Sequence, residues 1–243
     1  KNYNDLYSLN ISEYRDVWFS TSYNFDKIQT KNKLANKRFE NYKKQPLEFI
    51  FPKKFTGKIL NSTNKINAAI IREKGSNSER EMAYMMSLSG FNVKDVHMTD
   101  IISGRENLKD ISLLVAVGGF SNSDVLGSAK GWAGSFIYNK KAKQTLNDFF
   151  NRDDSMSLGV CNGCQLFIEL GLINNDHDLK PKMEYNDSGK FECIFTSVKI
   201  QDSPSIMMKG MEGSNLGVWA AHGEGKFIFP YDESKYTIPA KYS

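Results

Sequence analysis

The 243-residue sequence has only three cysteines, three histidines and six prolines. Three cysteines are too few, and odd in number, for a disulfide framework. No apolar run approaches the roughly 20 residues that span a bilayer, and the longest runs include 68–71 and 113–117. The first ten residues lack a basic and then apolar signal pattern. We therefore expect a cytoplasmic protein in a reducing compartment, with no membrane partner.

Residues that bind phosphate or metal are also scarce. The sequence contains no Gly-x4-Gly-Lys phosphate loop, and its three histidines do not pair with one another at metal-ligand spacing. Hydrophobic residues make up 40% and charged residues 25% of the chain, which is typical of a globular protein with a sizeable core. We expect no metal or cofactor bound to these 243 residues.

The net charge of +4 is unevenly distributed. Residues 1–64 contain 12 Lys and Arg against 6 Asp and Glu, and 12 of the 30 aromatic residues. Basic residues with interleaved aromatics are one signature of nucleic-acid binding. We favour the alternative, in which aromatics such as Trp18 and Phe39 lie on helices and pack against another domain while the lysines stay solvated. Residues 1–64 are therefore interpreted as a basic, aromatic helical connector, without a nucleic-acid partner.

From residue 65 onward, short apolar runs alternate with helical patterns. Buried strands are predicted at 66–71, 91–96, 112–117 and 156–160. Helices are predicted over 78–89 and before the fourth strand, and the Gly- and Ser-rich residues 118–139 are predicted to form a loop. Further strands are expected within 191–200, 216–221 and 226–229. The alternation of strand and helix indicates an α/β domain with a mostly parallel central sheet.

The segment GVCNGCQ, residues 159–165, places Cys161 between a strand and a helix with a glycine two residues away on each side. A nucleophile on such a sharp turn needs small neighbours, because its backbone is strained and its side chain must project freely. Unpaired N–H groups at the start of the helix stabilise negative charge placed there. The pattern indicates covalent catalysis by the Cys161 thiol.

The spacing of Cys161 and Cys164 also fits half a zinc site or a redox pair. A zinc site would need a second pair of ligands, and only Cys193 remains elsewhere. The flanking glycines suit a nucleophile turn better than a redox pair. We interpret Cys164 and Cys193 as buried structural cysteines.

Several motifs together carry a family resemblance. GVCNGCQ resembles the nucleophile turn of class I glutamine amidotransferases, whose sheet is flavodoxin-like. The companion motifs resemble the C-terminal glutaminase domain of the large, single-chain phosphoribosylformylglycinamidine synthases; they are VHM at 96–98, VGGFS at 117–121, DVLG at 124–127, GWA at 131–133 and AHGEG at 221–225. The resemblance covers roughly residues 65–230. It implies a glutamine amidotransferase domain over 65–243, preceded by a connector from the synthase half.

The resemblance implies glutamine hydrolysis through a Cys161 thioester. Its oxyanion hole would be the backbone N–H groups of Gly119 and Asn162. Glutamine would be held by residues matching the family's substrate cradle, namely Ser121, Gln165 and the backbone at Gly223 and Glu224. The released ammonia would pass to the synthase domain of the same polypeptide. That domain would bind ATP and Mg²⁺ and act as a C–N bond-forming ligase in purine biosynthesis.

The base that would deprotonate Cys161 is the point at which the sequence departs from the family. His222 and Glu224 form a His-x-Glu pair after a strand, which without the family would be assigned as the base and its orienting carboxylate. The family places this pair in a later Pro-His-x-Glu segment, which does not occur before Ser243. We therefore expect the chain to be a fragment, truncated at its C-terminus and lacking the synthase half before Lys1, with little or no activity alone. His222 as the base stays the alternative.

Two other functions remain open from the sequence. A cysteine hydrolase with the same turn would act on acyl or carbonyl substrates, and a docking domain could keep the turn without chemistry. Of the other histidines, His97 is expected to make a structural contact at a strand end, and His177 is expected to be solvated in a polar loop.

Overall fold

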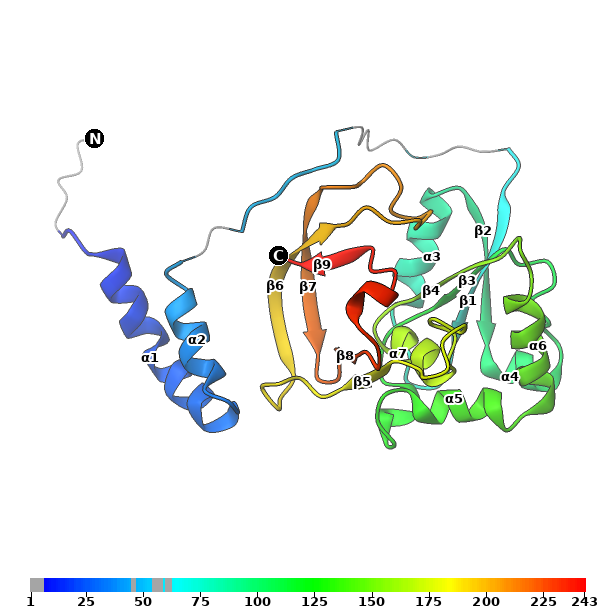
Figure 1. Ribbon diagram of the computed structural model, residues 1–243, viewed down its shortest axis with the longest axis horizontal. Coiled ribbons are helices and arrows are strands. Elements are labelled where there is room, and N and C mark those ends of the chain that lie inside the picture. The colour runs from blue at the N-terminus through cyan, green and yellow to red at the C-terminus, as the bar shows by residue number, and fades with distance from the viewer. Residues whose placement is uncertain (1–6, 45–46, 54–58, 60–62) are drawn as a thin grey trace. The chain divides into compact units, whose positions relative to one another are not determined.

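The computed structural model describes residues 7–44, 47–53, 59 and 63–243, and its chain divides into two compact units (Figure 1). The first, here called the hairpin unit, comprises Lys1–Lys54, Tyr185–Lys226 and Thr237–Ser243. The second, here called the elbow unit, comprises Phe55–Glu184 and Phe227–Tyr236. The domain boundary expected after residue 64 adjoins residues 60–62, which lie outside the described part of the chain, and it stays a prediction.

The elbow unit is built on a four-stranded parallel sheet with the strand order β2-β1-β3-β4. Its strands are β1 (Ile66–Arg72), β2 (Phe91–His97), β3 (Leu113–Ala116) and β4 (Met156–Gly159). In register, Ile70 lies opposite Val115, and Val115 lies opposite Leu158. The four predicted strands and the parallel α/β sheet are therefore confirmed.

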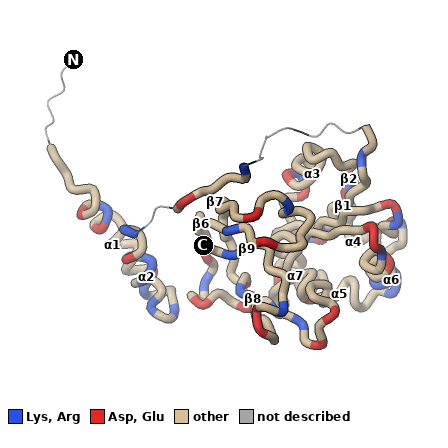
Figure 2. The backbone as a smooth tube through the Cα atoms, turned by 45° about the horizontal axis from the view of Figure 1, so that its top comes forward, with Lys and Arg blue, Asp and Glu red and all other residues tan. Residues whose placement is uncertain are grey.

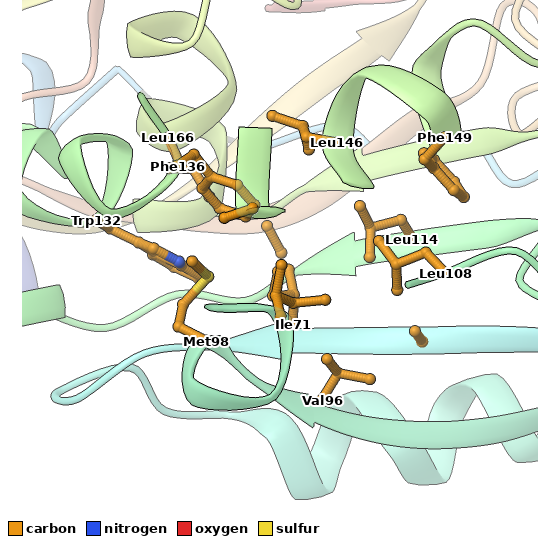
Figure 3. Close-up of a cluster of buried hydrophobic side chains, with 14 of the residues drawn as sticks. Ile71, Val96, Met98, Leu108, Leu114, Trp132, Phe136, Leu146, Phe149 and Leu166 are labelled. Atoms are coloured by element: carbon orange, nitrogen blue, oxygen red, sulfur yellow. The ribbon is translucent and has the colours of Figure 1, made fainter. Parts of the chain in front are cut away.

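Helices cover both faces of this sheet. One face packs against α3 (Glu79–Leu88), and the opposite face packs against α4 (Met98–Ser103), α5 (Lys130–Ile137), α6 (Lys140–Phe150) and α7 (Asn162–Glu169). The alternation of β1 explains the two cores: Ala68 and Ile70 face α3, and Ala69 and Ile71 face the other helices. Figure 3 shows the larger core, in which Trp132 and Phe136 lie near Ile71.

The prediction of a loop over 118–139 is wrong in part. After β3 the chain forms a short 3₁₀ turn, η1 (Ser121–Asp124), and then helix α5. Helix α5 starts after Ala129 in a left-handed conformation and has no side-chain cap. Its local sequence therefore carries no start signal. The complete burial of Trp132 and Phe136 stabilises this helix through tertiary packing.

The start of α7 lies directly against β3. A Cβ atom at Gly163 would lie 2.1 Å from the backbone oxygen of Ala116, far inside any real contact distance. A Cβ atom at Gly159 would lie 2.7 Å from the oxygen of Gly163. These two glycines let the helix leave the sheet with almost no spacing, which fixes where its first residues lie.

A small two-stranded sheet completes the elbow unit. Its strands are β5 (Lys182–Glu184) and β8 (Lys226–Ile228), and η2 (Glu233–Lys235) follows. The expectation that His177 is solvated is wrong. Its ring packs edge-on against Tyr231 and Tyr236, at centroid distances of 5.5 and 5.0 Å. The tyrosines follow more than 50 residues later, so the local polar sequence gave no sign of this contact.

The hairpin unit begins with two helices, α1 (Ile11–Gln29) and α2 (Leu34–Asn41). Two stacked aromatic pairs join the segments, Phe19 with Tyr42 and Tyr23 with Phe39. Figure 2 shows acidic and basic residues interspersed along both helices. None of the helices among the described residues combines the length and apolar content needed to cross a bilayer.

The same unit contains an antiparallel sheet of β6 (Glu192–Ile200), β7 (Asn215–His222) and β9 (Ala240–Tyr242), in the order β7-β6-β9. Phe195 of β6 lies opposite Trp219 of β7, and their rings are 5.4 Å apart. The strands predicted near 191–200 and 216–221 are confirmed.

Ion pairs connect α1 and α2 to Lys190 and to Glu192, the first residue of β6. Arg38 donates to Asp26 at 2.5 Å and to Glu192 at 2.6 Å, and Lys190 also pairs with Asp26. Burial raises the pKa of Asp26, but hydrogen bonds from Lys190 and Thr30 and the charge of Arg38 together lower it below the ordinary value. The ionised carboxylate therefore stabilises this part of the unit.

We expect Gly163→Ala to destabilise the elbow unit by about 1–3 kcal/mol, because the added Cβ would collide with the Ala116 carbonyl. Gly134→Ala is the matched control. It lies in α5, where the nearest atom to a new Cβ is 3.7 Å away, and it should be neutral or stabilising by up to about 1 kcal/mol. Urea denaturation of both variants measures the difference, and equal effects would contradict this account of the α7 contact.

The depressed pKa of Asp26 predicts a pH dependence. Its contribution is present above the unfolded pKa near 3.8 and is lost as the pH falls through the lower folded value. At pH 7, Asp26→Asn should therefore accelerate hydrogen–deuterium exchange in α1 and α2. Asp16→Asn, which removes the more exposed pair with Lys43, should have little effect. Similar exchange in both variants would exclude a special role for Asp26.

Candidate active site

The candidate site lies where the loops that follow β1 and β3 meet at the carboxyl edge of the parallel sheet. The backbone N–H of Asn77 donates to the Gly118 oxygen at 2.9 Å, and the N–H of Phe120 donates to the Gly75 oxygen at 2.9 Å. At the end of β4, the N–H of Val160 donates to the Ala116 oxygen at 3.0 Å. Ligand sites of open α/β sheets form at this edge.

Cys161 occupies the turn between β4 and α7, as the sequence predicts. Its backbone has φ 53° and ψ −113°, a conformation that residues with a side chain rarely adopt, and it caps the N-terminus of α7. Such strain costs on the order of 1–3 kcal/mol and persists only where the surroundings impose it. The residue is nonetheless exposed. The turn therefore presents the Cys161 side chain to solvent at the start of a helix.

The neighbouring glycines leave room for this side chain. A Cβ atom at Gly118 would lie 3.1 Å from the Cβ of Cys161 and 3.6 Å from its Sγ. Gly119 has φ +112°, and a Cβ there would lie 2.6 Å from the Gly75 oxygen. Only glycine fits at Gly119, since both the conformation and the close approach of the β1 loop exclude a side chain.

The predicted oxyanion hole consists of two backbone N–H groups, and its assignment stays a prediction. Gly119 follows β3, and Asn162 is the first residue of α7. Within the described ranges, neither N–H donates to a backbone carbonyl. Unsatisfied N–H groups at a helix start are suited to stabilise an oxyanion.

A buried side-chain network adjoins the turn. The Asn162 side chain accepts from the Ser121 N–H at 3.1 Å and donates to Gln165 Oε1 at 2.8 Å. Asn162 is 1% exposed and Ser121 is 2% exposed. The structure thus brings together Ser121, Gln165 and Asn162, three of the residues that the sequence singled out. The side-chain role of Asn162 was missed, because the sequence motif pointed only to its backbone.

The two other cysteines differ in environment. Burial raises the pKa of the Cys164 thiol, and the charge of the nearby Cys161 raises it further. Cys193 is exposed on β6 of the hairpin unit, so its interpretation as a buried structural cysteine is wrong. Among the described residues, no cluster of three or more His, Cys, Asp or Glu side chains forms a metal-binding arrangement.

His222 ends β7 in the hairpin unit, together with the turn that contains Gly223 and Glu224. The Nδ1 atom of His222 lies 2.8 Å from Asn186 Oδ1. The Asn186 amide nitrogen donates to the backbone oxygens of Lys190 and His222, so its Oδ1 is the atom that faces the ring. His222 Nδ1 therefore carries the proton, and Asn186 orients the imidazole.

The Asn186 contact was not predicted, because 36 residues separate it from His222 and neither segment shows a motif that joins them. The backbone N–H of Asn186 also donates to the Gly223 oxygen at 2.9 Å, which holds the turn after β7. The assignment of His222 as the catalytic base and Glu224 as its orienting carboxylate stays a prediction.

His97 makes the expected structural contact. Its Nδ1 accepts from the Thr99 N–H at 3.2 Å, and Asp100 accepts from the His97 N–H, so His97 caps helix α4. Histidine is an unusual capping residue, which explains why the sequence predicted a contact at this position but no helix start.

Comparison with known proteins bears on both the fold and the site. A family model for CobB/CobQ-like glutamine amidotransferase domains matches residues 65–242. The chain is 43% identical over 227 residues to a probable phosphoribosylformylglycinamidine synthase of Arabidopsis thaliana. This alignment covers 89% of the chain and 16% of that protein. The chain is also 37% identical over 250 residues to the Homo sapiens phosphoribosylformylglycinamidine synthase. That alignment covers 95% of the chain and 19% of the human protein.

The chain therefore spans less than a fifth of the length of these relatives. Among solved structures, PurLQS from Thermotoga maritima superimposes with a TM-score of 0.59 at 23% identity, covering 74% of this chain and 75% of that chain. This similarity supports the fold predicted from the sequence.

The different environments of the cysteines predict selective alkylation. In a Cys193→Ser background near pH 7.5, iodoacetamide should modify Cys161 at least about tenfold faster than Cys164, because Cys164 is shielded and its pKa is raised. Peptide mass spectrometry over time gives both rates. In urea the two rates should converge. Equal rates in the folded chain would contradict the geometry of this turn.

Proposed function

The chain belongs to the family of CobB/CobQ-like glutamine amidotransferase domains, and from this premise we propose that it hydrolyses glutamine at Cys161 and supplies the ammonia to a synthase domain. The observation that carries the proposal is the exposed Cys161 on a strained turn beside two N–H groups without backbone acceptors in the described part of the chain. This arrangement suits attack on an amide carbonyl.

In the first step, the Cys161 thiolate attacks the side-chain carbonyl carbon of glutamine. The carbonyl oxygen becomes an oxyanion that accepts hydrogen bonds from the N–H groups of Gly119 and Asn162. When the tetrahedral intermediate collapses, the C–N bond breaks, and the nitrogen takes a proton and leaves as ammonia. A glutamyl thioester remains on Cys161. Water then attacks the thioester and releases glutamate and the thiol.

The remaining part of the substrate would be held by polar groups. Ser121 and Gln165 lie in the elbow unit beside the nucleophile turn. The contribution of the backbone at Gly223 and Glu224 stays an expectation from the family resemblance. Ser121 and Gln165 would orient the glutamine so that its amide carbon faces the Cys161 sulfur.

The ammonia would be used by a phosphoribosylformylglycinamidine synthase domain. The support is the set of relatives of that name, which are at least 37% identical to this chain and much longer than it. In that reaction the synthase domain would use ATP and Mg²⁺ to convert the formylglycinamide ribonucleotide to its amidine, a step of purine biosynthesis. ATP, Mg²⁺ and the ribonucleotide would bind to the synthase domain.

Deprotonation of Cys161 requires a base. Two candidates follow from the sequence: His222, whose ring Asn186 orients, or a histidine outside these 243 residues. Repeated turnover by this chain alone would be slow if the base lies elsewhere, because loss of one member of such a triad costs several orders of magnitude in rate. A single covalent modification needs only the thiolate.

We expect a chloroketone analogue of glutamine to modify Cys161 stoichiometrically. Peptide mass spectrometry should locate the adduct on Cys161, excess glutamine should slow its formation, and Cys161→Ala should abolish it. Cys193→Ala is the matched control and should label as the unsubstituted chain does, since Cys193 lies in the hairpin unit. An adduct elsewhere, or one unchanged in Cys161→Ala, would refute the proposal.

The same assay separates the rival functions. A cysteine hydrolase for other acyl groups would be protected by its own esters or carbonyl compounds rather than by glutamine. A docking domain without chemistry would show no glutamine-dependent protection of Cys161 at all.

A further inference from the structure

We propose that the Asn162 side chain is a positioning residue that sets which end of the Gln165 amide faces the substrate. The inference rests on the proposed glutaminase function, and it assigns a role to a side chain whose backbone alone was expected to act. Its basis is one continuous chain of hydrogen bonds, from the Ser121 N–H through Asn162 to Gln165.

The direction of this chain follows from chemistry alone. A backbone N–H can only donate, so the Asn162 atom 3.1 Å from the Ser121 nitrogen must be the oxygen. The amide nitrogen of Asn162 then faces Gln165 at 2.8 Å, and the atom that accepts its hydrogen bond must be the Gln165 oxygen. The Gln165 NH₂ group is thereby directed away from Asn162, as a donor.

The position of Asn162 makes this control effective. Asn162 and Gln165 are three residues apart on α7 and lie on one face of the helix. Ser121 lies 41 residues earlier, in the loop that also contains Gly119. Because Asn162 is 1% exposed, water cannot readily replace a lost bond, and an inverted amide would leave buried groups unpaired.

A second feature indicates that a polar ligand group belongs beside this network. The Ser121 hydroxyl oxygen is buried and has no hydrogen-bond partner among the described residues. Buried hydroxyls are usually paired, so an unpaired one beside the Asn162 side chain calls for a partner such as a polar ligand. A Gln165 amide that presents donors would suit the carboxylate or carbonyl oxygen of such a ligand.

Asn162→Asp tests the inference, because it keeps the size of the side chain and its bond from Ser121 but removes the donor to Gln165. Two carboxylate or carbonyl oxygens would then face each other, so the Gln165 amide should invert and present its oxygen to the substrate. The measurement is the inactivation of the full chain by the glutamine chloroketone, analysed for the half-saturating concentration and the maximal rate.

We expect the half-saturating concentration to rise about tenfold to a hundredfold, the cost of one or two lost hydrogen bonds, with the maximal rate changed by less than about threefold. Iodoacetamide lacks the amino-acid part, so its rate with Cys161 should fall by less than about threefold, the effect of the added negative charge on the thiolate. Asn139→Asp is the matched control. Asn139 caps α6 by accepting from the Ala142 N–H, a role that Asp fulfils equally well.

Gln165→Glu supplies a second, independent variant. It keeps an acceptor for Asn162 but replaces the NH₂ donors with oxygen, so it should raise the half-saturating concentration to a similar extent. The double variant combines Asn162→Asp with Gln165→Met, so that neither an amide nor a second carboxylate faces residue 162. If Asn162 acts through Gln165, this double variant should be weakened far less than the product of the two single effects.

An unchanged half-saturating concentration in Asn162→Asp, or multiplicative effects in the double variant, would overturn the inference. A fall in the iodoacetamide rate as large as the expected rise in the half-saturating concentration would also overturn the inference, because it would show that the substitution disturbs the whole turn. Failure of the proposed function is distinguishable, since the chloroketone would then show no glutamine-protected labelling of Cys161 in the unsubstituted chain.

Discussion

The close contact between the first turn of α7 and strand β3 is the constraint on which the candidate site depends. With no side chain at Gly163, the helix approaches the Ala116 carbonyl more closely than any other residue would permit. The chain must therefore turn sharply after β4, and Cys161 takes up a strained conformation with a positive φ at that turn. The buried packing of the elbow unit offsets this strain, so that the fold holds the nucleophile in an otherwise unfavourable position.

The loops around this turn are joined to one another as well as to the sheet. Backbone hydrogen bonds join the loop after β1 to the loop after β3, and the Asn162 side chain joins the latter to α7. Cys161, the N–H groups of Gly119 and Asn162 and the Gln165 amide thus belong to one connected network. In the proposed reaction such preorganised donors would lower the barrier, because they need no rearrangement when charge develops on the oxyanion.

The hairpin unit is stabilised by different interactions. Aromatic stacking joins its two helices, and the pairs that Asp26 makes with Arg38 and Lys190 connect them to the segment before β6. The basic, aromatic composition of the N-terminal quarter is therefore explained in part by contacts within the unit. Trp18, which is 79% exposed, is not part of these contacts.

The sequence by itself determined the parallel α/β sheet and the place of Cys161, because apolar runs, glycines and the cysteine are local signals that neighbouring residues cannot reverse. It did not determine helix α5, the ring packing of His177 or the partner of His222. Those features depend on the burial of Trp132 in the core and on the contacts of Tyr236 with His177 and of Asn186 with His222. All of these interactions join residues that are far apart in the sequence. The tertiary structure alone decided the direction of the Gln165 amide, because a backbone N–H 41 residues before Asn162 orients both side chains.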